Sequence, residues 1–155
     1  MNTIKIMKKL YFDGACVPKN PGGDIGIGFW VEDENEKQIY SYSKFIPRSD
    51  FSTETSNNVA EYLALKEGLE YCSSKGITEL EVFGDSKLVI EQMNGNWRIK
   101  KGIYLPYAEQ TKAWVGEYTK IQFNWIRREK NTIADDLSKR DIPTELLNEI
   151  EMYKK

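Results

Sequence analysis

Two aspartates that directly follow short apolar stretches are the residues in this sequence best suited to chemistry. Asp13 follows Leu10–Phe12 and precedes Gly14, and Asp85 follows the stretch 79–84 in the same way. Both stretches alternate with the period of a β-strand, and Gly14 is expected to let the backbone turn immediately after Asp13. A single Asp-Gly pair is typical of an ordinary turn. Two strands with this ending predict a shared site at one edge of a sheet, where a metal ion can bind.

Two further acids are expected to join these aspartates. Glu61 lies one turn before Leu65 at the margin of a predicted helix's apolar stripe, where a solvated or salt-bridged glutamate is the simpler interpretation. Asp135 or Asp136 opens the helix after the fifth predicted strand. Converging carboxylates repel one another at neutral pH unless divalent cations neutralise them. Oxygen ligands alone favour Mg²⁺ or Mn²⁺ over zinc.

The sequence contains no histidine. This absence excludes serine and cysteine triads that depend on imidazole, and it excludes zinc sites with histidine ligands. Carboxylates therefore remain the candidate catalytic groups.

Charge is distributed unevenly along the chain. The formal net charge is -2, but residues 95–140 contain ten basic and five acidic residues, so the remainder carries -7. A basic half beside an acidic half suits a surface that follows phosphates next to a carboxylate metal site. A solvated lysine-rich face would give the same count, so charge alone leaves both interpretations open.

Hydrophobic periodicity predicts the elements that must position these acids. Strands are expected at 9–14, 25–32, 38–46, 79–84 and 120–126, and helices at 57–76, from 86 to about 94, at about 106–118 and from about 131. The first three strands follow one another as an antiparallel meander, and helical crossovers produce parallel neighbours. The predicted fold is an α/β fold with a mixed five-stranded sheet, three antiparallel strands and then two parallel ones, flanked by helices.

Length and composition favour one domain. The chain has 155 residues with 40% hydrophobic content, enough for one core, so residues 1–155 are expected to form a single domain. Residues 1–8 are interpreted as an N-terminal extension and 142–155 as a C-terminal helix or tail. No apolar run reaches the ~20 residues of a membrane span, and two cysteines do not indicate a disulfide scaffold. A soluble cytoplasmic protein that does not bind membranes is expected.

Four sequence blocks, in this order, resemble ribonuclease H of type 1. They are Asp13-Gly14-Ala15-Cys16 with Asn20-Pro21-Gly22, then Asn57-Asn58 with Ala60-Glu61, then Gly84-Asp85-Ser86, then Asn131 with Ala134-Asp135 and Leu137. The match extends from Tyr11 to about Arg140. Each block is weak alone, but four in order with compatible spacing are specific.

The resemblance implies a monomeric endoribonuclease that cuts the RNA strand of an RNA/DNA hybrid and leaves 5'-phosphate and 3'-hydroxyl ends. By the same resemblance, Asp13, Glu61, Asp85 and Asp135 bind two Mg²⁺ ions, with Mn²⁺ able to substitute, about 3.5–4 Å apart. Activity on double-stranded RNA stays open. Two alternatives are a catalytically inactive hybrid-binding module, which should lack an acid, and a phosphomonoesterase with an aspartate nucleophile, which should carry a second acid where Ala15 stands.

The resemblance also implies a substrate surface. Backbone groups around Gly14, Ala15 and Cys16, together with Asn57, Asn58 and Glu61, match positions that follow the hybrid's minor groove and its 2'-hydroxyls. Asn20 and Ser56 match the region that holds a phosphate of the DNA strand, although Asn20 before Pro21 also suits a simple turn.

The chain departs from bacterial relatives in two places and looks like the archaeal-type variant. The loop before the last acid lacks the bacterial histidine, which is thought to assist the exchange of metal and product. Arg128 is expected to take its place. The bacterial basic protrusion is replaced by a short segment in which Trp97, Arg98 and Lys100 are expected to contact the hybrid backbone. Ordinary packing of Trp97 remains an equal alternative.

Two criteria disagree about the fourth acid. If Ile133 and Leu137 form a buried i, i+4 pair, periodicity favours Asp136. The sequence block instead aligns Asp135 with the family's acid, and the unpaired N–H groups of a helix N-terminus favour a carboxylate there. The block is the more specific criterion, so Asp135 is expected to bind metal.

Overall fold

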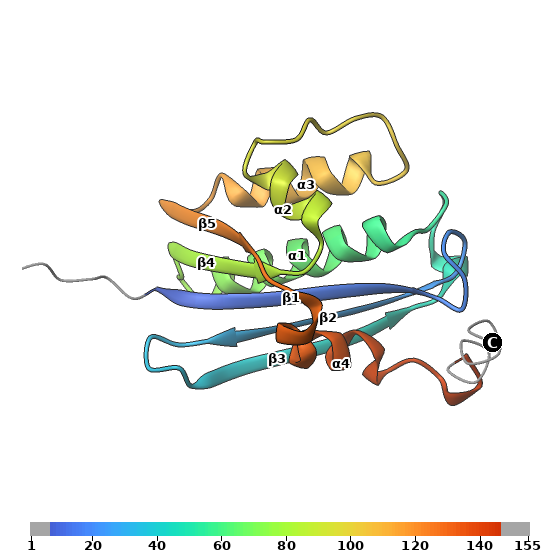
Figure 1. The fold of residues 1–155 in the computed structure, drawn as a ribbon, viewed down its shortest axis with the longest axis horizontal. Helices are drawn as coiled ribbons and strands as arrows, with labels where there is room; N and C mark the ends of the chain where they lie inside the picture. The colour runs from blue at the N-terminus through green and yellow to red at the C-terminus, as the bar shows by residue number, and fades with distance from the viewer. Residues whose placement is uncertain (1–6, 147–155) are drawn as a thin grey trace, which may run out of the picture.

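The computed structural model describes residues 7–146, which build one five-stranded sheet with helices on both faces (Figure 1). The strands are β1 (Lys8–Val17), β2 (Asp24–Glu32), β3 (Gln38–Ile46), β4 (Glu79–Gly84) and β5 (Lys120–Trp125). The α-helices are α1 (Asn57–Ser74), α2 (Lys87–Met93), α3 (Leu105–Val115) and α4 (Thr132–Arg140), with short 3-10 turns at Arg48–Asp50 and Arg128–Lys130.

The sheet has the strand order β3-β2-β1-β4-β5. β1 pairs antiparallel with β2, and β2 pairs antiparallel with β3, whereas β4 runs parallel to both β1 and β5. The predicted mixed sheet, three antiparallel strands and then two parallel ones, is confirmed.

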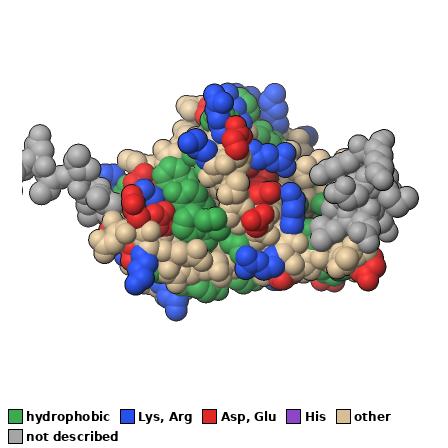
Figure 2. Space-filling model, turned by 60° about the horizontal axis from the view of Figure 1, so that its bottom comes forward, with side chains coloured by type: hydrophobic (Ala, Val, Ile, Leu, Met, Phe, Trp, Pro, Cys, Tyr) green, Lys and Arg blue, Asp and Glu red, His purple; other side chains and the backbone are tan. Residues whose placement is uncertain are grey.

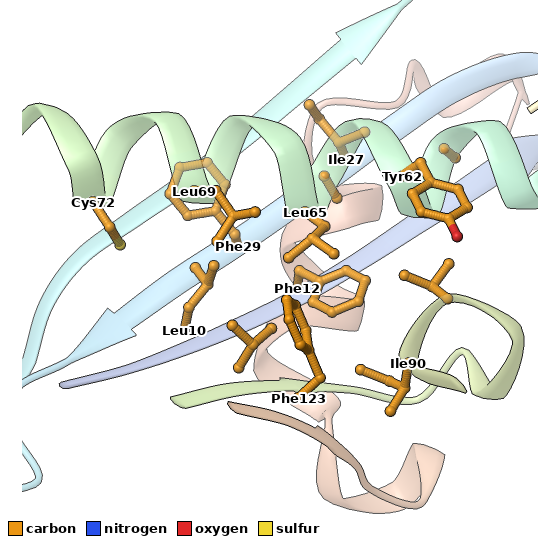
Figure 3. Close-up of a cluster of buried hydrophobic side chains, with 14 of the residues drawn as sticks. Leu10, Phe12, Ile27, Phe29, Tyr62, Leu65, Leu69, Cys72, Ile90 and Phe123 are labelled. Carbon is orange, nitrogen blue, oxygen red and sulfur yellow. The ribbon is translucent and has the colours of Figure 1, made fainter. Parts of the chain in front are cut away.

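The core lies between α1 and one face of the sheet (Figure 3). The stripe predicted for this helix is fully buried: Tyr62, Leu65, Leu69 and Cys72 are each 0% exposed. Leu10 and Phe12 of β1 and Phe29 of β2 project from the sheet beneath this stripe. Ser56 begins α1, since its Oγ accepts a hydrogen bond from the N–H of Val59 at 3.2 Å.

The helix α4 lies on the opposite face of the sheet, against β1, β2 and β3 (Figure 1). Two glycines of β2 allow this approach. A Cβ at Gly28 would lie 2.5 Å from the backbone nitrogen of Ser138, and one at Gly26 would lie 2.0 Å from its carbonyl oxygen. Ala15 and Val17 pack with Ile142 on the same face. This packing holds the C-terminal half of α4 and the residue Ile142 against the sheet.

The first strand is longer than predicted, and the expected turn at Gly14 is wrong. β1 continues to Val17 and pairs with β2 over its whole length, with Asp13 opposite Gly28 and Gly14 opposite Ile27. Gly14 is therefore a strand residue, and Asp13 does not end the strand. The glycine serves a close contact instead, since a Cβ there would lie 2.3 Å from the backbone carbon of Ala60 in α1.

The two ends proposed for the domain are described only in part. Met7 is buried and Lys8 already belongs to β1, and the predicted tail is described as far as Leu146. Residues 1–6 and 147–155 lie outside the described residues. Between 7 and 146, no helix combines the length and apolarity that a membrane crossing needs.

Candidate active site

Asp13, Glu61 and Asp85 converge from three different elements. One carboxylate oxygen from each lies within 4.8 Å of the others. The pairing of β1 with β4 stops at Tyr11 and Phe83, so Asp13 and Asp85 each lie two residues beyond the last paired positions of neighbouring parallel strands. Ligand sites of open α/β sheets form at such carboxyl ends, where the chain direction of the sheet switches.

Glu61 reaches this site because α1 packs directly on β1 at Gly14. Its side chain is buried, 9% exposed, so the solvated margin position considered from the sequence is wrong. The apolar stripe is wider than the spacing of Leu65 and Leu69 suggested, and it includes the first turn of the helix. Glu61 Oε2 is buried and has no hydrogen-bond partner.

The fourth acid comes from α4. Asp135 is half-buried and its side chain interacts with that of Asp13, whereas Asp136 is exposed. Ile133 is 44% exposed, so the buried pair that favoured Asp136 does not exist. The buried face of α4 is formed by Ala134, Leu137 and Ser138.

Asn131 ties α4 to the strand that carries Asp13. It is 1% exposed and donates from Nδ2 to the carbonyl oxygen of Phe12 at 2.9 Å, and its own carbonyl accepts from the N–H of Asp135 at 3.0 Å. Asn131 was part of a sequence block, but no positioning role was predicted for it. The geometry fixes the N-terminal turn of α4, and with it Asp135, against β1.

The pKa values of the four acids are shifted in different directions by their surroundings. Burial, together with the charge of Asp85, raises the pKa of Asp13 to about 7. Burial and the neighbouring Asp13 raise the pKa of Glu61 well above its ordinary value, and burial also raises that of Asp85. Burial acts in the same direction on Asp135, but Lys139, Asp13 and Arg128 together outweigh it, so the pKa of Asp135 lies below its ordinary value. Without a cation, Asp13 and Glu61 are therefore easier to protonate than carboxylic acids in water.

Lys139 is a site residue that the sequence interpretation missed. Its Nζ lies 3.0 Å from Asp135 Oδ1, one helical turn away. The i, i+4 spacing of an acid and a lysine in a predicted helix was the signal that could have found it.

Comparison with known proteins shows the family to which the chain belongs. Residues 12–141 match the sequence profile of a family described as reverse transcriptase-like. The chain belongs to this family. The matched region contains all four acids and every element of the sheet except the first residues of β1.

The curated proteins that match this sequence are longer than the chain. The chain is 37% identical over 87 residues to "Ribonuclease HI" of Halobacterium salinarum, which is 56% of this chain and 40% of the relative. It is 43% identical over 82 residues to "Bifunctional protein Rv2228c" of Mycobacterium tuberculosis, which is 53% of this chain and 22% of the relative. The alignments thus span well under half the length of these relatives.

Solved structures of type 1 ribonucleases H share the fold. The structure of RNase H1 from Halobacterium salinarum superposes with a TM-score of 0.77 at 25% identity, covering 86% of this chain and 96% of that one. The N-terminal RNase H domain of rv2228c from Mycobacterium tuberculosis gives 0.77 at 29%, covering 97% and 100%. LC11-RNase H1, solved with an RNA/DNA hybrid, gives 0.73 at 30%, covering 96% and 99%. The predicted resemblance to type 1 ribonuclease H is confirmed.

The donor set of this reverse transcriptase-like domain fits a hard divalent cation. All the side-chain donors of the converging trio are carboxylates, and the unpartnered Glu61 Oε2 is an orphaned buried acceptor that a cation would satisfy. Mutual repulsion of the buried acids is the electrostatic cost that such a cation removes. Asp13, Glu61, Asp85 and the adjacent Asp135 are the residues that would hold it.

A cavity of about 230 Å³ opens at the acids, and its lining adds donors to the carboxylates. It is lined by Asp13, Asn57, Asn58, Glu61, Asp85, Ser86 and Arg128. Burial raises the pKa of Asp85, and the positive charge of Arg128 offsets part of that increase. Figure 2 shows acidic side chains in the middle of the face that carries α4, with lysine and arginine side chains around them. An acidic centre with a basic surround can bind a phosphate chain through a metal.

Several predicted substrate residues join one another in a network beside this cavity. Asn57 Oδ1 accepts from the N–H of Cys16, and Asn20 Oδ1 accepts from the N–H of Asn57, each at 2.9 Å. The buried thiol of Cys16 donates to the carbonyl of Lys19 at 3.3 Å. Both Asn57 and Asn20 are exposed, and both use the side-chain Oδ1 in these bonds. Ser56 uses its hydroxyl oxygen as the cap of α1.

Gly14 and Ala15 lie within β1, and the predicted contact of their backbone groups with substrate stays a prediction. The N–H of Gly14 donates to Asp13 Oδ1 at 2.9 Å, and the Ala15 side chain packs on the opposite face with Val17 and Ile142. Both residues support the site from within the fold.

Trp97, Arg98 and Lys100 line a different cavity, of about 390 Å³, beside α2 and α3. The buried Gln92 holds the loop, since its Nε2 donates to the carbonyl of Arg98 and to Tyr104 Oη, each at 3.1 Å. Trp97 is 45% exposed, so packing accounts for only part of its surface. These residues form a separate exposed group, outside the acidic cavity.

Proposed function

We propose that this domain is a ribonuclease H, a metal-dependent endonuclease that hydrolyses the RNA strand of RNA/DNA hybrids and leaves 5'-phosphate and 3'-hydroxyl ends. One observation carries the proposal: three carboxylates from β1, α1 and the end of β4 converge within 4.8 Å, with Asp135 beside them, in a fold shared with type 1 ribonucleases H. A relative of this fold, LC11-RNase H1, was solved with an RNA/DNA hybrid.

The four acids are proposed to hold two Mg²⁺ ions, with Mn²⁺ able to substitute. When bound, such ions activate a water nucleophile and stabilise the departing oxygen in phosphodiester hydrolysis. The protein's own contribution is to fix the carboxylates rigidly: α1 at the Gly14 contact and α4 through Asn131. Arg128, which lines the same cavity, is proposed to assist phosphate exchange without binding metal.

Recognition of RNA is proposed to fall to the N-terminus of α1. Asn57 and Asn58 border the acids, and the Oδ1 of Asn57 is already bound by the N–H of Cys16, so the Nδ2 group of this exposed residue is the proposed donor. An amide donor beside the scissile phosphate can bind a 2'-hydroxyl, the group that distinguishes RNA from DNA. Asn20 and Ser56 are proposed to hold a DNA phosphate, and Trp97, Arg98 and Lys100 a more distant part of the hybrid backbone.

The protein is further proposed to be a monomer and to act on RNA/DNA hybrids in the cytoplasm. Both cysteines, Cys16 and Cys72, are buried free thiols, which suits a reducing compartment. All four acids are present and Ala15 stands where a phosphomonoesterase would need an acid. Neither the inactive binding module nor the phosphomonoesterase is therefore favoured.

The test is cleavage of one RNA strand, labelled at its 5' end, in three settings: paired with DNA, paired with RNA and single-stranded, with labelled double-stranded DNA as a fourth substrate. We expect internal cuts in the hybrid in Mg²⁺ and none in chelator, and new ends that a 5'-phosphate-dependent exonuclease degrades. Release of terminal phosphate alone would support the phosphomonoesterase. Hybrid binding without cleavage in Mg²⁺ or Mn²⁺ would support the binding module.

A further inference from the structure

A cavity remote from the acids has an unusual lining. It has a volume of about 260 Å³ and is lined by residues of α1, β2 and β3. Four aromatic rings and two carboxylates line it: Phe29, Tyr40, Tyr42, Tyr71, Glu67 and Glu70. No lysine or arginine is among these residues, which are called the aromatic cavity below.

The rings of the aromatic cavity form a continuous group. Tyr40 and Tyr71 stack with centroids 3.8 Å apart, and Phe29 stacks on Tyr42 at 5.1 Å. Phe29 also contacts Tyr40 and Tyr71 in tilted geometry, at 5.9 and 6.0 Å. The faces and oxygen atoms of such rings are electron-rich, so they attract cations. The Tyr71 ring already contacts one cation, since Lys75 Nζ, which does not line the cavity, lies 5.7 Å from its centroid.

Glu67 supplies an acceptor whose bonding is incomplete. Its Oε1 lies 3.6 Å from Lys44 Nζ, whereas its Oε2 is buried and has no hydrogen-bond partner. A buried carboxylate oxygen without a partner is costly and calls for a ligand or a specific reason. Glu70 stands one turn further along α1, exposed at the opening of the cavity.

We propose that the aromatic cavity is a binding site for a small alkylammonium ion. The rings would contact the alkyl groups and the positive charge together, and the carboxylates of Glu67 and Glu70 would balance that charge. A bare divalent metal fits poorly, because it needs about six oxygen ligands and the lining offers mainly carbon. Glu67 lies six residues after Glu61, about 9 Å along the helix axis, so the site does not depend on the proposed hydrolysis.

The test is a titration of the full chain with choline at constant ionic strength. Binding is monitored through the NMR signals of the tyrosine rings. The neutral control ligand is 3,3-dimethylbutan-1-ol, which has the same shape with carbon in place of nitrogen. We expect saturable shifts of Tyr40, Tyr42 and Tyr71 with choline, and at least fivefold weaker binding of the alcohol.

Two variants separate the site from general charge attraction. Glu67→Gln keeps the shape and removes the charge, and we expect it to weaken choline binding at least fivefold. Glu109→Gln, an exposed residue of α3, removes the same charge elsewhere and should leave the affinity unchanged. Thermal unfolding of both variants checks that the fold is retained. Shifts that never saturate, equal affinity for the alcohol, or unchanged affinity in Glu67→Gln would each overturn the proposal.

Discussion

Asp135 and Asp136, neighbours in one helical turn, have different environments at this site. Asp135 is half-buried beside Asp13, and Asp136 points to solvent. The sequence block predicted this difference correctly, whereas periodicity did not, because the first turn of α4 is held by Asn131 and Ala134 and leaves Ile133 exposed. Apolar spacing over a nine-residue helix carries too little information to orient it.

Asp135→Asn is expected to lower Mg²⁺-dependent hybrid cleavage by on the order of 100-fold or more, since loss of a ligand should cost at least as much as loss of a residue that supports one. Asp136→Asn removes the same charge one residue away and should retain most activity. Cleavage rates of the two variants on one hybrid provide the comparison. The reverse ranking would transfer the metal role to Asp136.

Lys139 competes with any cation for Asp135, since its ammonium group already lies 3.0 Å from Oδ1. Lys139→Met should therefore lower the Mg²⁺ concentration needed for half-maximal cleavage by several-fold, because it removes both a competitor and a repelling charge. Lys112→Met on the exposed side of α3 is the matched control. A higher Mg²⁺ requirement in Lys139→Met alone would show that the lysine helps to organise the site.

The raised pKa of Asp13 predicts a pH dependence of stability in the absence of metal. Its folded pKa of about 7 lies above the ordinary value of 3.8, so the native state binds more protons than the unfolded state between these values. The contribution is fully present below about pH 4 and is lost as pH rises through about 7. In chelator, the melting temperature of Asp13→Asn relative to the parent should therefore rise between about pH 5 and pH 8. A constant difference across this range would contradict the buried, protonated state.

At the scale of elements, backbone proximity is what brings the acids together. The Asp-Gly pair was interpreted as a turn because that dipeptide is common in turns. The actual requirement, space for α1 against β1, is a tertiary contact that no local pattern contains. Strands β3 and β4 were predicted with their observed bounds, since each is delimited by polar or glycine-rich turns. The burial of Glu61 follows from the same contact and was missed for the same reason.

Gly14→Ala tests the contact between α1 and β1. Its Cβ would lie 2.3 Å from a backbone carbon of Ala60, so α1 must move, and we expect a loss of about 1–3 kcal/mol in the free energy of unfolding. Metal-dependent cleavage should fall as Glu61 moves away from Asp13. In the control Gly116→Ala, the new Cβ meets its nearest atom at 3.4 Å, so denaturant unfolding should show little change. Equal stability of the two variants would contradict a tight contact.

At the scale of the whole molecule, the sequence predicted the mixed five-stranded sheet, but not how the proposed substrate residues divide between two cavities. Hydrophobic periodicity predicted the strands and helices, and the four blocks include residues that hold these elements together, such as Gly14 and Asn131. The separation of Trp97, Arg98 and Lys100 from the acidic cavity depends on how the loop after α2 packs on Gln92. That packing joins a buried glutamine to an exposed basic loop, and hydrophobic periodicity does not predict such a contact.

The most direct measurement of the central claim is hybrid cleavage by the parent and Asp13→Asn as a function of Mg²⁺ concentration. Asp13 is the acid that contacts both Glu61 and Asp135, and the amide keeps its shape while removing the ligand charge. We predict that the parent cuts the RNA strand in Mg²⁺, and that Asp13→Asn folds normally yet shows no cleavage at any Mg²⁺ concentration. Near-parental cleavage by Asp13→Asn would contradict a carboxylate metal centre at this site.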